Sequence, residues 1–334
     1  MKLGIRILLI VIATATLAAG CTAPAGGRWP REGVVRPQSA RPPASVTTAR
    51  NLKLTIETDR EWYEVAQPVY ATVRLQNIGE QTQRVFGSLD PTSGAATFQV
   101  TGTDGKRRVF VPLVEADHDE SILTNLEPGA VIADVAPVFF GASGWTFDKP
   151  GQYAIEVTYE TPDGKGGVLA ASSGAVVVSI RPSPVGEDII GRGKGVSREV
   201  GKFLTWMTGD HLETGRAKLR EVIEKSPDSV MANYAHAAFA RSWGEAFTDY
   251  RKREVRPADC GQAMAQIART RAEILPPYVR LQLAFTAARC DARAGKSEAA
   301  RANIQIAKEL MRDRAEYRGL ADRVAELERY LSRN

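Results

Sequence analysis

The sequence predicts a multidomain protein in which an all-β sandwich is followed by an all-α stack of helices. Residues 49–182 contain short runs of alternating apolar residues that are separated by turn signals. Between residues 198 and 334 the apolar residues instead recur with the period of an α-helix. The composition is 43% apolar and 25% charged, which is typical of a folded chain and not of a disordered one.

The first twenty residues have the layout of an export signal. Lys2 and Arg6 supply positive charge, and the run from Ile5 to Leu17 is almost entirely apolar. This run is shorter than the roughly 20 apolar residues that a bilayer span needs. Small residues close it, as they do at a cleavage site. We therefore predict that residues 1–20 are a signal peptide.

The next residues indicate how the chain is held in its compartment. Ala18-Ala19-Gly20-Cys21 resembles the lipobox of bacterial lipoproteins, although that family usually has leucine where Ala18 stands. The resemblance implies that Cys21 is lipidated, becomes the N-terminus and holds the protein on a membrane of the cell envelope, facing the periplasm. Thr22 is not the aspartate that is associated with inner-membrane retention, which favours the outer membrane. The alternative is an ordinary secretory signal that leaves Cys21 as a free thiol.

Residues 21–48 are predicted to be a disordered tether. Proline, glycine, alanine, serine and arginine dominate this stretch, and neither the strand period nor the helix period survives in it. Such a composition cannot bury enough apolar surface to offset the entropy of ordering. The expected role of the tether is reach, because it lets the folded part stand away from the lipid.

The β region is expected to form an antiparallel sandwich. Strands with one apolar face, separated by turns, are typical of that architecture. The candidate strands are LKLTIET (52–58), VYATVRLQ (69–76), TQRVF (82–86), FQVTG (98–102), RRVFVPL (107–113), VIADVAPVFF (131–140), YAIEVTY (153–159) and AVVVSI (175–180). The region has no cysteine, so packing must supply its stability.

The segment FDKPGQY, residues 147–153, resembles the tyrosine corner of immunoglobulin-like sandwiches. In that motif the tyrosine ring packs in the core while its hydroxyl bonds a nearby backbone group, which pins the corner. Here the tyrosine is Tyr153. The resemblance implies an immunoglobulin-like fold for residues 49–182, of the kind found in bacterial extracellular adaptors.

Two prolines in Arg181–Pro184 end the sandwich, because proline cannot continue a strand ladder. Residues 183–197 are predicted to be a linker, and GRGKGVS within them lacks the spacing of a phosphate loop. Seven helices are expected after it. They are residues 198–207, 213–225, 229–247, 260–275, 278–295, 297–311 and 315–331.

One helix pair resembles a tetratricopeptide repeat. If Gly295 is the turn, Ala288 lies seven residues before it, and Ala300, Ile304 and Ala307 lie five, nine and twelve residues after it. Small residues at these places let two helices approach closely. The tryptophan and tyrosine positions of the family are not met, so the resemblance implies degenerate helical repeats. A plain helical bundle is the alternative.

The other two cysteines are expected to form a disulfide. Cys260 and Cys290 lie near the outer ends of two helices that turn back on each other at Pro276-Pro277. At 1.5 Å per residue their distances from the turn differ by roughly 5 Å, which a bend can absorb. An oxidising envelope favours the bond. Two separate buried thiols are the alternative, and the spacing of ligands does not favour a metal.

No combination of residues points to catalysis, a metal or a cofactor. Asp117-His118-Asp119 is interpreted as an acidic loop of the sandwich, and His211 and His236 as structural residues of helices. Residues 185–334 carry 27 basic and 21 acidic side chains, which alternate along the helices and do not cluster. That pattern favours a solvated face over a nucleic-acid interface. We therefore expect neither enzymatic activity nor nucleic-acid binding.

Taken together, these features predict a lipid-anchored interaction or scaffold protein of the cell envelope. The helical repeats are expected to bind a protein or peptide partner, with Tyr234, Phe239, Trp243 and Tyr250 as candidate contact residues. One alternative is a ligand-binding or protease-inhibitor-like module that acts through sandwich loops, Asp117–Asn125 among them. A hydrolase whose site assembles from distant positions is a further alternative.

Overall fold

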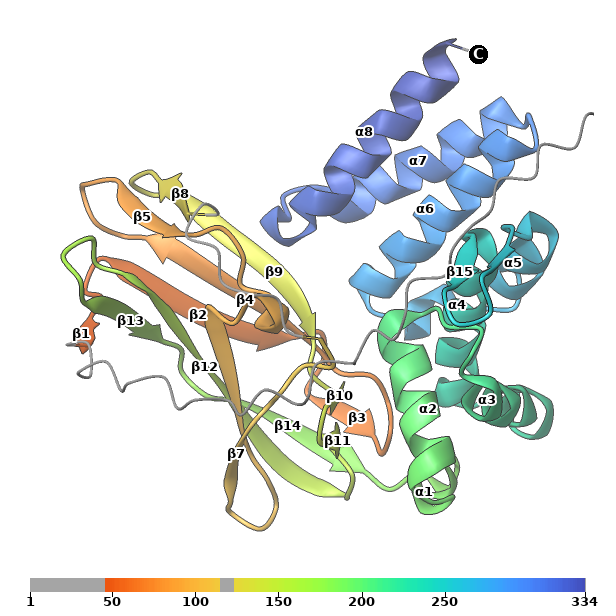
Figure 1. Ribbon diagram of the computed structural model, residues 1–334, viewed down its shortest axis with the longest axis horizontal. Coiled ribbons are helices and arrows are strands. Elements are labelled where there is room, and N and C mark those ends of the chain that lie inside the picture. Colours follow the sequence, from red (N-terminus) through yellow and green to blue (C-terminus); the bar gives the residue numbers. More distant parts are fainter. Residues whose placement is uncertain (1–45, 115–122, 334) are drawn as a thin grey trace, which may run out of the picture. The chain divides into compact units, whose positions relative to one another are not determined.

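The computed structural model describes residues 46–114 and 123–333 (Figure 1). The predicted signal peptide, Cys21, most of the predicted tether and His118 lie outside these ranges. The part of the chain that is described shows strands in its N-terminal region and eight α-helices in its C-terminal region, as the sequence predicts. None of these helices is both long enough and apolar enough to cross a membrane.

The strands of the N-terminal region form two main sheets. One has the order β1-β13-β12-β14-β3, with β6 paired to β12 and β7 paired to β6, and the other has the order β2-β4-β9. The strands are β1 (Val46–Thr48), β2 (Leu52–Thr58), β3 (Trp62–Glu64), β4 (Tyr70–Asn77), β5 (Gln83–Phe86), β6 (Ala96–Thr101), β7 (Arg107–Val109), β8 (Leu123–Leu126), β9 (Val131–Pro137), β10 (Phe140–Gly141), β11 (Gly144–Trp145), β12 (Gly151–Pro162), β13 (Val168–Ser172) and β14 (Val176–Arg181).

Alternation along the strands produces the core between the two sheets. In β4, Ala71, Val73 and Leu75 are buried while the residues between them are half-buried. Successive side chains of a strand point to opposite faces, so this pattern places one face of the sheet inside. The long strand β12 repeats the pattern with Tyr153, Ile155 and further buried residues.

The tyrosine corner is present at the start of β12. The hydroxyl of Tyr153 donates to the carbonyl of Lys149 at 3.0 Å. The ring of Tyr153 packs edge-on against Phe147, with 5.2 Å between ring centroids. The hydroxyl therefore fixes the corner to the strand that follows it.

The helices form a stack in which each packs against the next along the chain. In addition, α2 packs against α4, α4 against α6, and α6 against α8. The helices are α1 (Pro184–Gly191), α2 (Lys194–Trp206), α3 (Glu213–Lys225), α4 (Val230–Gly244), α5 (Cys260–Ile267), α6 (Pro277–Arg293), α7 (Ser297–Met311) and α8 (Arg318–Arg333). The hairpin of β15 (Phe247–Asp249) and β16 (Glu254–Arg256) separates α4 from α5.

The turn between α6 and α7 has the predicted form. Gly295 adopts the left-handed conformation with φ of 70°, which costs glycine little. Ala288, Ala300, Ile304 and Ala307 are all buried in one cluster between these helices. Cys260 and Cys290 form the predicted disulfide, with their Cα atoms 5.1 Å apart.

The predicted linker 183–197 is wrong, because it folds into α1 and the start of α2. The Ser183 hydroxyl accepts from the amide of Gly186 at 3.3 Å, and Pro184 occupies the first helical position, where it is well tolerated. Ile189 is fully buried in the core. At the N-terminal boundary of the sandwich, the last residues of the predicted tether form β1, which pairs with β13.

Two further boundaries differ from the sequence prediction. The helix expected over 229–247 ends at Gly244, and the chain then enters β15. The helix expected over 260–275 ends at Ile267, and a short 3-10 turn (Ala272–Ile274) precedes α6. In both cases helix-like composition continues past the point where the chain turns.

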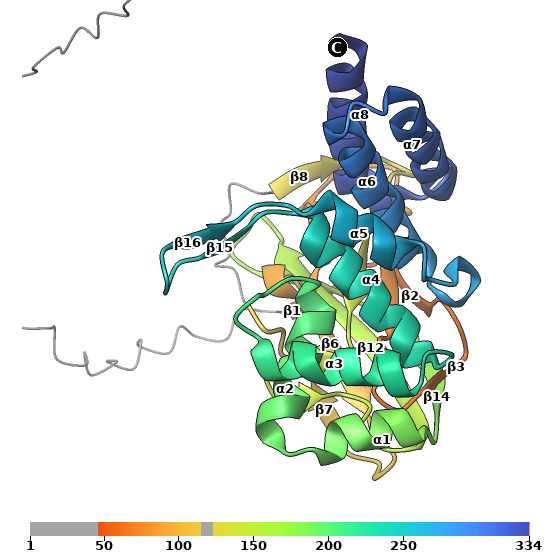
Figure 2. The same cartoon turned by 90° about the vertical axis from the view of Figure 1, so that its right-hand side faces the viewer.

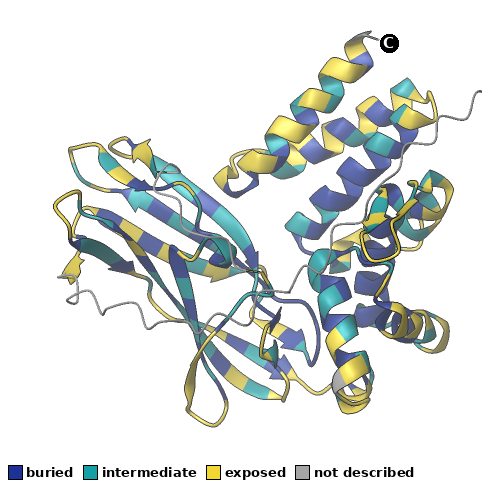
Figure 3. Ribbon diagram, viewed as in Figure 1, coloured by how far each residue is buried: buried dark blue, intermediate teal, exposed yellow. Residues whose placement is uncertain are grey.

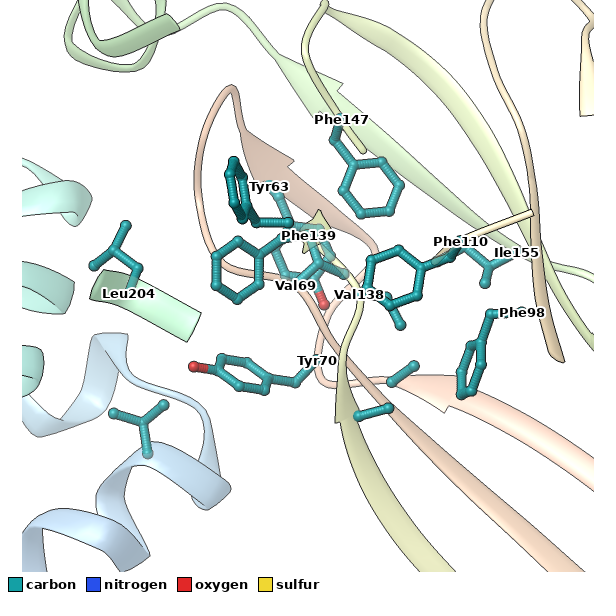
Figure 4. Packing of buried hydrophobic residues seen from close by; sticks show 14 of the residues in the cluster. Tyr63, Val69, Tyr70, Phe98, Phe110, Val138, Phe139, Phe147, Ile155 and Leu204 are labelled. Carbon is teal, nitrogen blue, oxygen red and sulfur yellow. The ribbon is translucent and has the colours of Figure 1, made fainter. Parts of the chain in front are cut away.

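Strand and helix side chains share one hydrophobic core (Figure 4). Figure 3 shows buried residues along the strands and along the helices. Leu204 of α2 belongs to the same cluster as Tyr63 and Phe139 of the sandwich. Gly201 of α2 lies so close to the ring of Phe140 that a Cβ at this position would be 2.1 Å from it. Helices and sandwich therefore pack directly against each other within the described residues.

Candidate functional site

The four predicted partner-binding residues do not form one surface. Tyr234 and Phe239 lie inside α4 and are almost fully buried. Because α2, α3, α5 and α6 all pack against α4, little of it reaches solvent. A helix that is apolar on every side is normally an internal one. The prediction is therefore wrong for these two residues, which belong to the core.

Trp243 is half-buried and packs against two arginines of the helical region. The guanidinium of Arg256 lies 4.7 Å from its ring centroid, and that of Arg216 lies 5.5 Å from it. Both arginines pair with the carboxylate of Asp210. Tyr250 lies elsewhere, at the tip of the β15–β16 hairpin, where it is 87% exposed. Of the four predicted residues, Tyr250 alone is strongly exposed.

The described histidines have structural surroundings. His211 is exposed and its ring stacks on Phe247, with 5.8 Å between centroids. His236 is buried, its Nδ1 lies 2.6 Å from Oε1 of Gln266, and desolvation lowers its pKa. Within residues 46–114 and 123–333, no group of three or more His, Cys, Asp or Glu side chains is placed to hold a metal ion.

A groove between α6 and α8 is the candidate site. Its volume is about 380 Å³. On α8 the lining residues follow the helical spacing i, i+4 and i+7, so they share one face. The groove is lined by Phe285 and Arg289 of α6 and by Arg323, Glu326, Leu327 and Tyr330 of α8.

Two arginines in this groove converge on one ring and one carboxylate. The guanidinium carbons of Arg289 and Arg323 lie 5.7 Å and 4.8 Å from the ring centroid of Phe285. Nη1 of Arg289 is 2.9 Å from Oε1 of Glu245, and Nη2 of Arg323 is 3.5 Å from the same oxygen. The planar cations therefore cover the buried Phe285 ring while Glu245 partly balances their charge.

This arrangement can receive a carboxylate beside an apolar group. A guanidinium carries five N–H donors, and carboxylates match its fork geometry. Each arginine uses one nitrogen for Glu245, so the other N–H groups of each guanidinium are not committed to that carboxylate. Leu327 supplies half-buried apolar surface next to them. Glu326 lines the groove as well, so its charges are mixed, and the two arginines beside Phe285 are its basic part.

Sequence reasoning missed this groove. Its residues come from two helices whose contact could not be known before folding. The available signal was the spacing of Phe285 and Arg289, and of Arg323, Leu327 and Tyr330, which puts each set on one helix face. That spacing alone does not distinguish a groove from an ordinary solvated face.

The sandwich carries a second hollow, with a volume of about 370 Å³, between β6–β7 and β10–β11. Val100, Phe110 and Trp145 supply its apolar side. Asp104 and Arg108 on its rim form an ion pair with each other. Of the predicted loop Asp117–Asn125, residues 117–122 lie outside the described residues, and residues 123–125 are not among those that line this hollow.

No family model matches the chain, and no curated protein matches it. Among solved structures, the CARDB domain of the PF1109 protein from Pyrococcus furiosus, in complex with di-metal ions, is 16% identical. That match covers 40% of this chain and 94% of that one, with a TM-score of 0.21.

Two other solved structures are similarly distant. The putative ApaA protein from Bordetella pertussis is 14% identical over 39% of this chain and 91% of that one, with a TM-score of 0.24. Spo0M, a sporulation control protein from Bacillus subtilis, is 12% identical over 42% of this chain and 54% of that one, also with a TM-score of 0.24. These likenesses carry no conclusion about activity, ligand or partner.

Proposed function

We propose that the protein is a lipid-anchored, non-catalytic interaction protein of the cell envelope that binds a protein or peptide partner through its helical region. The observation that carries the proposal is the groove between α6 and α8, where Arg289 and Arg323 converge beside Phe285. The partner segment is acidic and carries an apolar side chain next to its carboxylate. The groove needs no cofactor for this role.

The arrangement of the helices supports the prediction that this region is a stack of tetratricopeptide-like repeats. In such stacks the first helices of successive pairs line one face, on which partners bind. Here α2 packs against α4, α4 against α6, and α6 against α8, while α3, α5 and α7 alternate with them along the chain. The groove is formed by two helices of the first set. On this proposal the immunoglobulin-like sandwich is a rigid adaptor that supports the stack.

The anchoring part of the proposal rests on the N-terminal sequence. Lipid at Cys21 and a tether up to residue 45 place the folded part in the periplasm, with the outer membrane favoured. Each buried methylene of an acyl chain contributes about 0.8 kcal/mol, so several chains hold a protein durably on a membrane. Mass analysis of the N-terminal peptide from the native host tests this part separately.

Site-specific photo-crosslinking in the native host tests the groove. A photoreactive residue at Tyr330, which is 53% exposed, is expected to capture a discrete partner that mass spectrometry identifies. The same residue at Val177 of β14, which is 52% exposed, is the matched control. Arg289→Gln combined with Arg323→Gln is expected to abolish the adduct. Equal capture from both positions, or capture unaffected by the arginine changes, would show that the groove is not the binding site.

The ligand-binding alternative rests on the hollow beside Trp145. The indole of Trp145 donates to the hydroxyl of Ser197 at 2.8 Å, which fixes the β10–β11 hairpin against α2. A photoreactive residue at Ser143, on the rim of the hollow, distinguishes this alternative. Capture from this position with none from Tyr330 would favour the sandwich as the binding module.

A further inference from the structure

The hairpin of β15 and β16 extends away from the helical stack (Figure 2). Its tip is the sequence Tyr250-Arg251-Lys252-Arg253, and all four of these residues are exposed. Val255 on β16 is a further apolar residue at the surface, with 65% exposure. The hairpin therefore presents an aromatic ring and three consecutive cations to its surroundings.

The stem of the hairpin is firmly attached to the helices. Arg256 of β16 pairs with Asp210, and its Nη2 donates to the carbonyl of Ser242 at 2.7 Å. Its guanidinium also packs over the ring of Trp243. On β15, Phe247 stacks with the ring of His211. These contacts hold the hairpin in one direction, so its tip is a fixed projection.

The tip is ordered by its own acid, and its cations are incompletely paired. Oδ1 of Asp249 accepts from the backbone amides of Arg251 and Lys252 at 3.0 Å and 3.2 Å. The ammonium of Lys252 lies 3.7 Å from Glu213, and both of these side chains are exposed. Within the part of the chain that the structure describes, Arg251 and Arg253 make no ion pair. Such exposed pairing is weak, so the tip stays basic although the half-buried Asp249 and the exposed Glu254 flank it.

We propose that this tip docks on an anionic lipid surface, with Tyr250 in the headgroup layer and the three cations at lipid phosphates. Tyrosine favours the membrane–water interface because one end of its ring is apolar and the other polar. Lysine and arginine near an anionic bilayer are attracted to it. A stable protein complex buries roughly 800 Å² on each partner, which suits a broad face better than a narrow projecting tip.

This inference rests on the anchoring part of the proposed function, because an anchored chain needs only weak contact. The 24 residues between Cys21 and Val46 can span at most about 80 Å. A tether of that kind raises the effective concentration of the tip at the surface toward the millimolar range. The tip would then set the orientation of the folded part relative to the membrane, while the acyl chains supply retention.

Vesicle co-sedimentation tests the proposal without the anchor. The protein is the unacylated chain from Thr22 onward, which keeps every described residue. Vesicles of phosphatidylglycerol are expected to sediment it at low ionic strength, and vesicles of phosphatidylcholine are not. Each cation contributes about fivefold to the partition constant. Raising the salt to about 0.5 M should abolish binding, since it shortens the screening length to a few ångströms.

Variants of the tip residues distinguish binding by the tip from binding by the overall positive charge of the chain. Arg251→Gln, Lys252→Gln and Arg253→Asn together are expected to weaken binding about 100-fold; asparagine suits position 253, where φ is 55°. The control removes the same charge from exposed residues of the C-terminal helices and turns, by Lys296→Gln, Arg312→Gln and Arg318→Gln, and should change binding less than threefold. Equal losses in the two sets would overturn the proposal.

A probe on the tip reports contact directly. An environment-sensitive fluorophore on Tyr250→Cys is expected to shift to the blue with phosphatidylglycerol vesicles, and one on Lys165→Cys of the sandwich is not. Binding of a short DNA duplex in place of the vesicles, or no shift at position 250, overturns the lipid proposal. Neither result depends on the groove between α6 and α8, so the two proposals can fail separately.

Discussion

Gly201 of α2 should not tolerate a methyl group, because the helix meets the sandwich there. In Gly201→Ala the new Cβ would lie 2.1, 2.3 and 2.5 Å from three atoms of the Phe140 ring. Ordinary carbon contacts are about 3.5–4.0 Å, so the ring or the helix must move by more than 1 Å. The ring has little room, since Phe140 is 1% exposed and packs edge-on against Trp145 at 5.2 Å.

Two effects of opposite sign determine how far Gly201→Ala changes the free energy of unfolding. Overpacking of a core typically costs about 1–3 kcal/mol. Replacing glycine by alanine inside a helix stabilises the helix by up to about 1 kcal/mol. We therefore expect Gly201→Ala to lower the free energy of unfolding by about 1–2 kcal/mol, or Tm by about 2–6 °C. Gly195→Ala in the same helix meets no atom within 4 Å and should be neutral or slightly stabilising.

Thermal and urea unfolding of both variants measure the difference, and the background Phe140→Leu tests its cause. A smaller side chain at position 140 should relieve the clash, so Gly201→Ala should cost less in that background than in the wild type. The reasoning fails if Gly201→Ala is as stable as Gly195→Ala. It also fails if the cost is the same in both backgrounds, because the ring would then not be its source.

Three further predictions follow from single contacts. Replacing Cys260 and Cys290 by serine should lower the free energy of unfolding by about 3–4 kcal/mol for a loop of 30 residues, and dithiothreitol should then no longer change Tm. Burial lowers the pKa of His236. Stability should therefore fall as the pH drops below about 6.5, where the unfolded chain binds the proton first. His236→Gln should flatten that part of a stability-against-pH curve. Tyr153→Phe removes the bond to Lys149 and should cost about 0.5–1.5 kcal/mol in urea unfolding, with the strand content by circular dichroism unchanged.

The period of the apolar residues predicts the longer elements well and the short ones poorly. Strands such as β4 and β12 alternate over eight and twelve residues, which is enough to reveal one buried face. The strands β1, β3, β10 and β11 have two or three residues each, so no alternation can be seen in them. They exist because neighbouring strands offer backbone partners, as β13 does for β1.

The first helix was hidden by its glycines and prolines. The sequence from Ser183 to Gly193 reads as a linker, yet each residue type has a specific use in α1. Ser183 caps the helix, and Pro184 fits its first position. Gly186 is needed because a Cβ there would lie 1.9 Å from the carbonyl oxygen of Val65. Composition alone could not show that Val65, in the turn after β3 and far away in the sequence, requires a glycine at this place.

The position of the candidate groove follows from how many neighbours each helix has. Helix α4 is covered by four others, so its aromatic residues became core although their spacing resembled a contact face. Among the described residues, the main neighbours of helix α8 are α7, α6 and the short turn before it (Ala315–Tyr317), which leaves part of its surface for a groove. The core that sandwich and helices share limits what a deletion of the helices can show. Deleting residues 185–334 would expose the sandwich side of the shared core, Phe139 and Phe140 included. Loss of partner binding after that deletion would therefore not distinguish a missing groove from a damaged sandwich. Substitutions confined to Arg289 and Arg323 replace no residue of the two hydrophobic clusters, and they are the changes that can assign binding to the helices.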